Sequence, residues 1–173
     1  NGVKSASNPT ERVQEKPETS TVKPVEAKNA LFASKLITTK TKGHAVEVKT
    51  KIKGIQNLYL TVSDGSNSYS CDWADWGLPR LIDSSGKETR LTDLKWKYAK
   101  SGWGKVQINK NCGGRPLKIN GKDITYGIGT HANSVIHYEL PKNHKFVEFR
   151  CLAGIDNGGS DQKNGSDSSV QFF

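Results

Sequence analysis

The spacing of turn-forming residues constrains the fold more than any other feature of this sequence. Gly, Asn, Asp, Ser and Pro interrupt the chain at short intervals, and the apolar runs between them are brief. Residues 45–53 alternate apolar and polar side chains over most of their length, which is typical of a strand with one buried face. We find no helical periodicity of convincing length. The pattern therefore predicts an all-β fold, with the strands stacked as a sandwich.

Other short apolar runs extend this prediction along the chain. A dense run at residues 58–62 predicts a central strand, and polar turns are expected at residues 63–67 and 83–87. Further strands are expected at residues 31–37, 105–108, 117–119, 134–139, 146–152 and 169–173.

The first 29 residues differ in composition from the rest. They carry Pro, Thr and mixed charge with almost no large apolar side chains, so burial could not offset the entropy of ordering them. We expect a disordered linker over residues 1–29 and one domain over residues 30–173. The chain does not begin with Met, so we expect it to come from a longer precursor. The linker composition indicates that the module is joined to further domains, and we expect the parent protein to be secreted or at the cell surface. No stretch has the roughly 20 apolar residues that a membrane-spanning helix requires.

The net charge of +9 raises the question of nucleic-acid binding. We expect no nucleic-acid partner, because no basic cluster is interleaved with stacking aromatic residues. Lys49, Lys51 and Lys53 alternate along one strand and are better interpreted as a solvated strand face. The three cysteines at positions 71, 112 and 151 lack zinc-site spacing, so they are either buried free thiols or one pair and one free thiol.

Two groups of motifs are more specific than strand propensity. The first comprises Leu-Thr-Asp-Leu-Lys-Trp at 91–96, Ser-Gly-Trp-Gly at 101–104, Gly-Thr-His-Ala-Asn-Ser at 129–134 and Gly-Ile-Asp-Asn-Gly-Gly at 154–159. It resembles the NPCBM/NEW2 family, a carbohydrate-binding module grouped as family 51 and related to galactose-binding-domain-like sandwiches. The second, residues 58–65 followed by Cys-Asp-Trp-Ala-Asp-Trp at 71–76, resembles the segment that normally closes the same domain. The resemblance implies a jelly-roll-like antiparallel β-sandwich.

The order of these motifs is reversed relative to the family pattern. The closing part, residues 30–83, precedes the opening part, residues 88–173. The chain could hold the tail of one module and the head of a second, or it could be one circularly permuted module. We favour permutation because every expected motif is present once and two separate half-sandwiches would each leave unpaired strand edges.

A sugar offers a C–H face to an aromatic ring and hydroxyls to planar polar groups. The loop residues that fit this chemistry are Trp76, Trp103, Asp75, His131, Asn133, Asp156 and Asn157. Trp73 and Trp76 are three residues apart, so one is expected in the core and the other at the rim. Trp103 could stack on ligand or cap the core. His131 could contact a sugar hydroxyl or hold its loop by bonding Asp72 or Asp75.

Calcium is the cofactor that the resemblance suggests. Related sandwiches often carry a structural calcium ion, and Asp64, Asp72 and Asp161 are oxygen donors in or near Gly-rich loops. Capping of turns by these side chains is the competing interpretation.

Carbohydrate binding without catalysis is the expected function. No nucleophile accompanies His131 in a known arrangement, and a scaffold of this size offers no deep pocket for a pair of catalytic carboxylates. We expect an accessory module that recognises galactose-type glycans. One alternative is a structural or protein-interaction sandwich that has lost sugar binding, since many relatives have His where this chain has Trp73. The other is a fragment of an enzyme whose catalytic domain lies outside this sequence.

Overall fold

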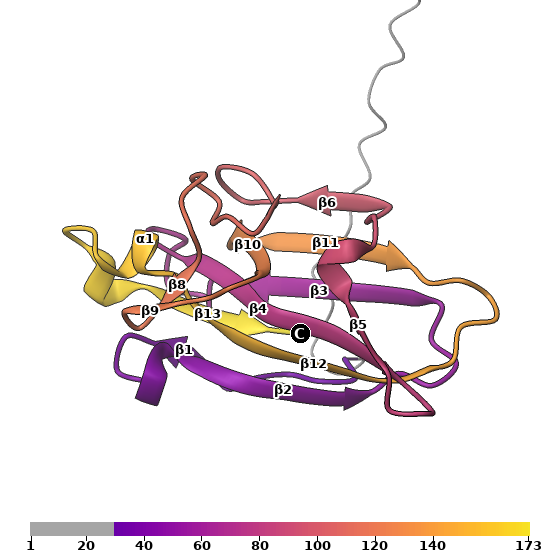
Figure 1. Ribbon diagram of the computed structural model, residues 1–173. Coiled ribbons are helices and arrows are strands. Elements are labelled where there is room, and N and C mark those ends of the chain that lie inside the picture. The colour runs from indigo at the N-terminus through magenta and orange to yellow at the C-terminus, as the bar shows by residue number, and fades with distance from the viewer. Residues whose placement is uncertain (1–29) are drawn as a thin grey trace, which may run out of the picture.

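The computed structural model describes residues 30–173, which form two antiparallel β-sheets packed face to face (Figure 1). Sheet one contains, in spatial order, β1 (Ile37–Thr38), β13 (Ser169–Phe172), β3 (Asn57–Ser63), β11 (Ser134–Glu139) and β6 (Tyr98–Lys100). Sheet two contains β2 (Ala45–Lys51), β12 (Phe146–Ile155), β4 (Trp73–Asp83), β10 (Gly127–His131) and β7 (Gln107–Ile108), and β5 (Glu88–Arg90) pairs with β4. The predicted antiparallel β-sandwich is thus confirmed.

The remaining elements are short. A two-stranded ribbon of β8 (Lys118–Ile119) and β9 (Lys122–Asp123) lies outside the two main sheets. The single described α-helix is α1 (Asn157–Ser160), and 3-10 turns occupy Lys42–His44, Leu91–Asp93 and Gly165–Asp167. None of the helices in the described part of the chain is both long and apolar enough to cross a membrane.

Side-chain alternation places the core between the sheets. In β2, Val48 is buried against the core while Lys49 points outward. The centre of the core is aromatic: Trp76 meets Phe172 edge to face at 4.8 Å between ring centroids and lies 6.3 Å from Phe149. Such pairs add about 0.5–1.5 kcal/mol beyond the area they bury.

Strands from the two parts of the chain alternate in both sheets. In sheet one, β3 lies between β13 and β11, and in sheet two, β12 lies between β2 and β4. The chain passes from one part to the other through the expected turn after Asp83, whose carboxylate accepts hydrogen bonds from the backbone N–H groups of Ser85 and Lys87. Residues 30–83 and 88–173 therefore build one shared core.

The prediction of a strand over residues 31–37 is mostly wrong, since only Ile37 and Thr38 form a strand there. Upstream, Ser34 donates its backbone N–H to the carbonyl of Phe172 at 2.9 Å, and its hydroxyl accepts the N–H of Phe172. These bonds fix a single point of the segment rather than a continuous ladder. Cys71, Cys112 and Cys151 are all free and buried.

One end of the sandwich gathers the long loops. There β3, β10 and β12 end while β4, β11 and β13 begin, as the pairing of His131 with Trp73 and of Ser134 with Val62 requires. We call this end the rim, and its loops are residues 64–72, 101–116, 132–133 and 156–168.

Candidate binding site

Trp73, the first residue of β4, forms the base of the rim. Loops approach its indole so closely that a Cβ atom at Gly113 or Gly158 would lie 2.5 or 2.6 Å from ring carbons. The guanidinium of Arg115 lies 5.8 Å from the ring centre. Only glycine fits at the two loop positions, and the loops leave Trp73 only 7% exposed.

Trp103 lies on this base and remains 53% exposed, with its ring centroid 5.3 Å from that of Trp73. The Ser101 hydroxyl holds the loop by donating to the Trp103 carbonyl at 2.6 Å and accepting the His131 N–H at 3.0 Å. Gly102 donates its N–H to the His131 carbonyl at 3.0 Å. A Cβ atom at Gly102 would lie 2.2 Å from the Ala132 carbonyl oxygen, so this contact also requires glycine. The loop that carries the exposed indole is therefore fixed against the end of β10.

His131 lies between Trp103, 5.9 Å away, and Tyr69, 6.5 Å away between ring centroids. Its Nδ1 lies 2.5 Å from the Ala132 carbonyl oxygen, which can only accept, so Nδ1 carries the proton. Burial lowers the pKa of the imidazole, so the ring is neutral at pH 7 and Nε2 offers a lone pair. The anticipated bonds to Asp72 or Asp75 are not found among the described residues.

Asn133 joins two loops of the rim. Its Nδ2 donates to Asp64 Oδ2 at 3.1 Å, and its Oδ1 accepts the Asp64 backbone N–H at the same distance. Asp64 Oδ1 accepts the N–H of Ser66 as well. This pair fastens the turn after β3 to the turn after β10, so both side chains are already engaged.

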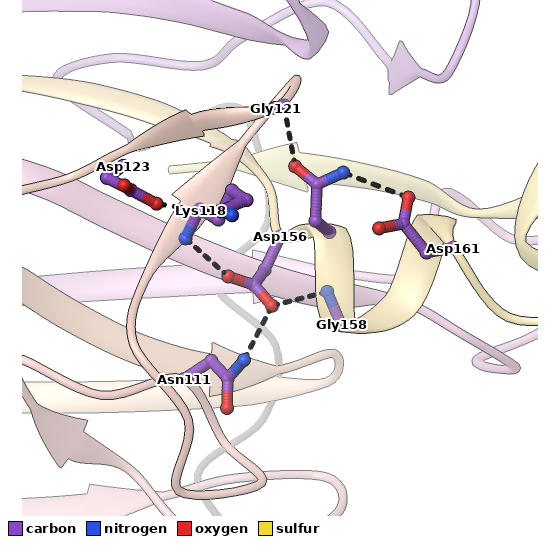
Figure 2. A network of polar contacts seen from close by, with 8 residues as sticks. Asn111, Lys118, Gly121, Asp123, Asp156, Gly158 and Asp161 are labelled. Carbon is purple, nitrogen blue, oxygen red and sulfur yellow. Dashed lines mark hydrogen bonds and ion pairs between the residues drawn. The ribbon is translucent and has the colours of Figure 1, made fainter.

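A polar pocket of about 510 Å³ lies beside Trp73 and is organised by Asp156. Figure 2 shows this carboxylate accepting hydrogen bonds from the Asn111 amide at 2.8 Å, from Gly158 N–H at 2.7 Å and from Lys118 N–H at 2.9 Å. Asn157 Oδ1 accepts the Gly121 N–H, and its Nδ2 donates to Asp161. The lining comprises Asn111, Arg115, Pro116, Lys118, Asp123, Asp156, Asn157, Gly158, Asp161 and Gln162.

Asp75 lies beneath this pocket, fully buried, and neither carboxyl oxygen has a hydrogen-bond partner among the described residues. Burial raises the pKa of Asp75 far above its usual value, and the adjacent charge of Asp156 raises it further. Asp75 is therefore protonated at neutral pH. The same two causes raise the pKa of the Cys112 thiol, which stays protonated.

The structure brings part of the predicted set together. Trp103 and His131 meet at the rim, Asn133 braces it, and Asn157 and Asp156 line the pocket. The prediction that Trp76 contacts sugar is corrected. Trp76 is 1% exposed in the core, because its side of β4 faces Phe172 of the other sheet. Asp75 and Asp156 are also fully buried, and His131 is only 4% exposed.

Sequence reasoning missed Tyr69, Asn111, Arg115 and Gln162. Tyr69 had a signal, since it is a single aromatic residue in a run of Ser and Asn, and it is 65% exposed. The other three had none, because their position depends on how the loops fold over Trp73.

No group of three or more His, Cys, Asp or Glu side chains in the described part of the chain is arranged to hold a metal ion. The carboxylates of Asp64 and Asp161 accept hydrogen bonds from N–H groups. Asp72 accepts the Ser169 N–H at 2.8 Å, and its second oxygen has no hydrogen-bond partner within residues 30–173. Calcium binding by these three residues stays a prediction.

Comparison with known proteins supplies the context for this rim. The sequence model of the NPCBM/NEW2 domain matches residues 13–82 and 87–173, so the match is interrupted at the turn between β4 and β5. An alpha-1,3-galactosidase B of Akkermansia muciniphila is 35% identical over 69 residues, which are 40% of this chain and 8% of that protein. A putative endo-alpha-N-acetylgalactosaminidase of Renibacterium salmoninarum is 33% identical over 107 residues, 57% of this chain and 7% of that protein. The chain thus spans less than a tenth of either relative. No solved structure matches it significantly.

Proposed function

Because this chain belongs to the NPCBM/NEW2 domain family, a family of carbohydrate-binding modules, we propose that its rim binds galactose-type glycans without catalysing their cleavage. The observation that carries the proposal is Trp103: its indole is more than half exposed, lies beside the neutral imidazole of His131, and is carried by a loop that Ser101 holds in place. An ordered, exposed aromatic plate next to a hydrogen-bond acceptor is what a pyranose ring requires.

The geometry suggests how a sugar would be held. One face of galactose carries a patch of C–H groups that can lie on the Trp103 indole, while a hydroxyl donates to Nε2 of His131. Arg115 and Gln162 border the polar pocket and can donate to further hydroxyls of a longer glycan. Shallow sites of this kind bury little area, so we expect weak binding by a single site.

The names of the relatives support the choice of sugar. One is described as acting on galactosides and the other on N-acetylgalactosaminides, and both are many times longer than this chain. We propose that the module belongs to a larger secreted or cell-surface protein and concentrates it on such glycans.

Isothermal titration with galactose, N-acetylgalactosamine, glucose and mannose tests the proposal. We expect heat from the first two, and its loss in Trp103→Ala, because the apolar plate is removed. Tyr59→Ala is the matched control, since Tyr59 is a 44%-exposed aromatic residue on β3 that stacks on His137, away from the rim. The absence of heat from every sugar, or equal loss in both variants, would instead favour a structural or protein-interaction sandwich.

A further inference from the structure

Four basic residues form a row across sheet two. Lys49 of β2 pairs directly with Arg150 of β12, Arg150 with Arg80 of β4, and Arg80 with Arg90 of β5. Adjacent strands are about 4.8 Å apart, so the row covers about 14 Å perpendicular to the strands. Like charges placed directly opposite one another destabilise a sheet. A row of four therefore needs a compensating partner.

Carboxylates in the sheet compensate only part of this charge. Glu148 contacts both Lys49, at 3.7 Å, and Nε of Arg150, and Glu88 accepts from Nε of Arg80 at 3.1 Å. Arg90 makes no ion pair among the described residues, and its guanidinium lies 4.4 Å from the ring centre of Tyr126. Two carboxylates thus contact three of the four cations.

The contacts also orient the guanidinium groups. Both Glu148 and Glu88 use the Nε edge of their arginine, and Nη1 of Arg80 donates to the Leu78 carbonyl at 3.2 Å. Within the described residues, three groups have no hydrogen-bond partner: Nη1 and Nη2 of Arg150, and Nη2 of Arg80. These fixed N–H donors match the geometry of an oxyanion with several acceptor oxygens.

A groove of about 440 Å³ runs through the row and adds a second kind of contact. Leu78 and Leu152 give it apolar surface, while Lys49, Arg80 and Arg150 line it with positive charge and Glu47 adds one carboxylate to the lining. A sugar ring could pack on the leucines while its charged substituents reach the arginines.

We propose that this face of sheet two binds a sulfated polysaccharide laid across β2, β12, β4 and β5, which lie side by side in Figure 1. Sulfate esters remain charged throughout the neutral pH range and accept several hydrogen bonds. The apolar surface in the groove favours a chain of sugar rings over a chain of phosphates. The net charge of +9 would steer such a polyanion to the protein. This surface is separate from the rim and does not depend on galactose binding there.

The experiment compares oligosaccharides of carrageenan, a sulfated galactan, with those of unsulfated agarose and with duplex DNA, by titration at about physiological salt. We expect the carrageenan oligosaccharides to bind more tightly than the other two. Arg80→Gln/Arg150→Gln should weaken that binding about tenfold or more, because hydrogen bonds to charged groups are lost. Lys95→Gln/Lys100→Gln, on exposed residues in and beside β6, removes the same charge elsewhere and should have little effect.

Two further variants keep the test decisive. Lys49→Gln/Arg90→Gln changes the exposed ends of the row and covers the case in which the first variant does not fold. Trp103→Ala should leave the preference for carrageenan over agarose unchanged, because it alters only the rim, to which both galactans have equal access. Equal binding of DNA, equal loss in the Lys95/Lys100 control, or loss of the preference for carrageenan over agarose in Trp103→Ala alone would each overturn the inference. The last of these would leave the proposed function intact.

Discussion

Among single residues, Asp72 has the clearest consequence for stability. It is fully buried where β4 and β13 begin, and burial raises its pKa from 3.8 to about 7, with a further increase from the charge of Asp64. The hydrogen bond from Ser169 N–H opposes this shift but does not cancel it. The folded state therefore binds a proton that the unfolded state releases above about pH 4.

This difference fixes the sign of the pH dependence. The free energy of unfolding should fall as pH rises from about 4 to 7, by at most about 4 kcal/mol from Asp72. Asp72→Asn keeps an acceptor for Ser169 and carries no charge, so it should flatten this decline. Urea denaturation across that pH range measures the effect, and Asp93→Asn, on an exposed side chain, serves as control. An unchanged slope in Asp72→Asn would contradict the assignment.

The sequence predicts a site residue correctly where its side chain suits sugar binding and its neighbours place it in a loop. Trp103 lies between two glycines in a loop, and His131 follows Gly129 and Thr130, so both were predicted near the rim. The sequence does not decide which of Trp73 and Trp76 lies in the core and which at the rim, because this depends on which face of β4 is covered by residues 111–118. Only the folded chain shows that Trp73 lies under these loops while Trp76 meets Phe172.

Among the elements, β4 connects the core, the rim and the basic row. Its register against β12 shifts between Gly77 and Arg80, where Leu78 has a positive φ of 51° and donates its N–H to Tyr126. The irregularity leaves Arg80 opposite Arg150, so the row depends on it. Alternation predicts which strands are half-buried, but one sequence does not reveal such a register or the order of strands in a sheet.

The carboxyl pair of Asp75 on β4 and Asp156 after β12 yields a second prediction. Asp75→Asn should leave thermal stability at neutral pH nearly unchanged, since a neutral amide replaces a protonated, neutral acid of almost the same shape. Asp156→Asn should cost about 1–3 kcal/mol, because its NH2 group cannot accept from all of Asn111, Gly158 and Lys118. Thermal denaturation of both variants at pH 7 provides the measurement. A larger loss in Asp75→Asn than in Asp156→Asn would mean that Asp75 is ionised in the folded protein.

At the scale of the whole molecule, the two parts of the chain meet in one sandwich. We propose that residues 30–173 are one circularly permuted module. Both parts contribute strands to each sheet, and Ala30 and Phe173 line the same apolar pocket of about 280 Å³. A short linker could therefore join these positions, as permutation of a sandwich requires.

The rearranged chain, with residues 88–173 placed before 30–83, tests this arrangement. Its new ends would lie at the turn between β4 and β5, where the family match is also interrupted. We expect both the original and the rearranged chain to be monomeric and to unfold in one cooperative step. Sedimentation and denaturation would detect the alternative, in which half-modules expose an open core and associate.

The unequal exposure of the indoles has a practical consequence for studying this protein. Trp103 is largely open to water, whereas Trp73 and Trp76 are 7% and 1% exposed. Acrylamide should therefore quench the emission of Trp103 selectively, and Trp96, which is half-buried, to a smaller extent. The protein thus carries its own optical reporter at the place where contact with sugar is proposed, and occupancy can be followed without a dye.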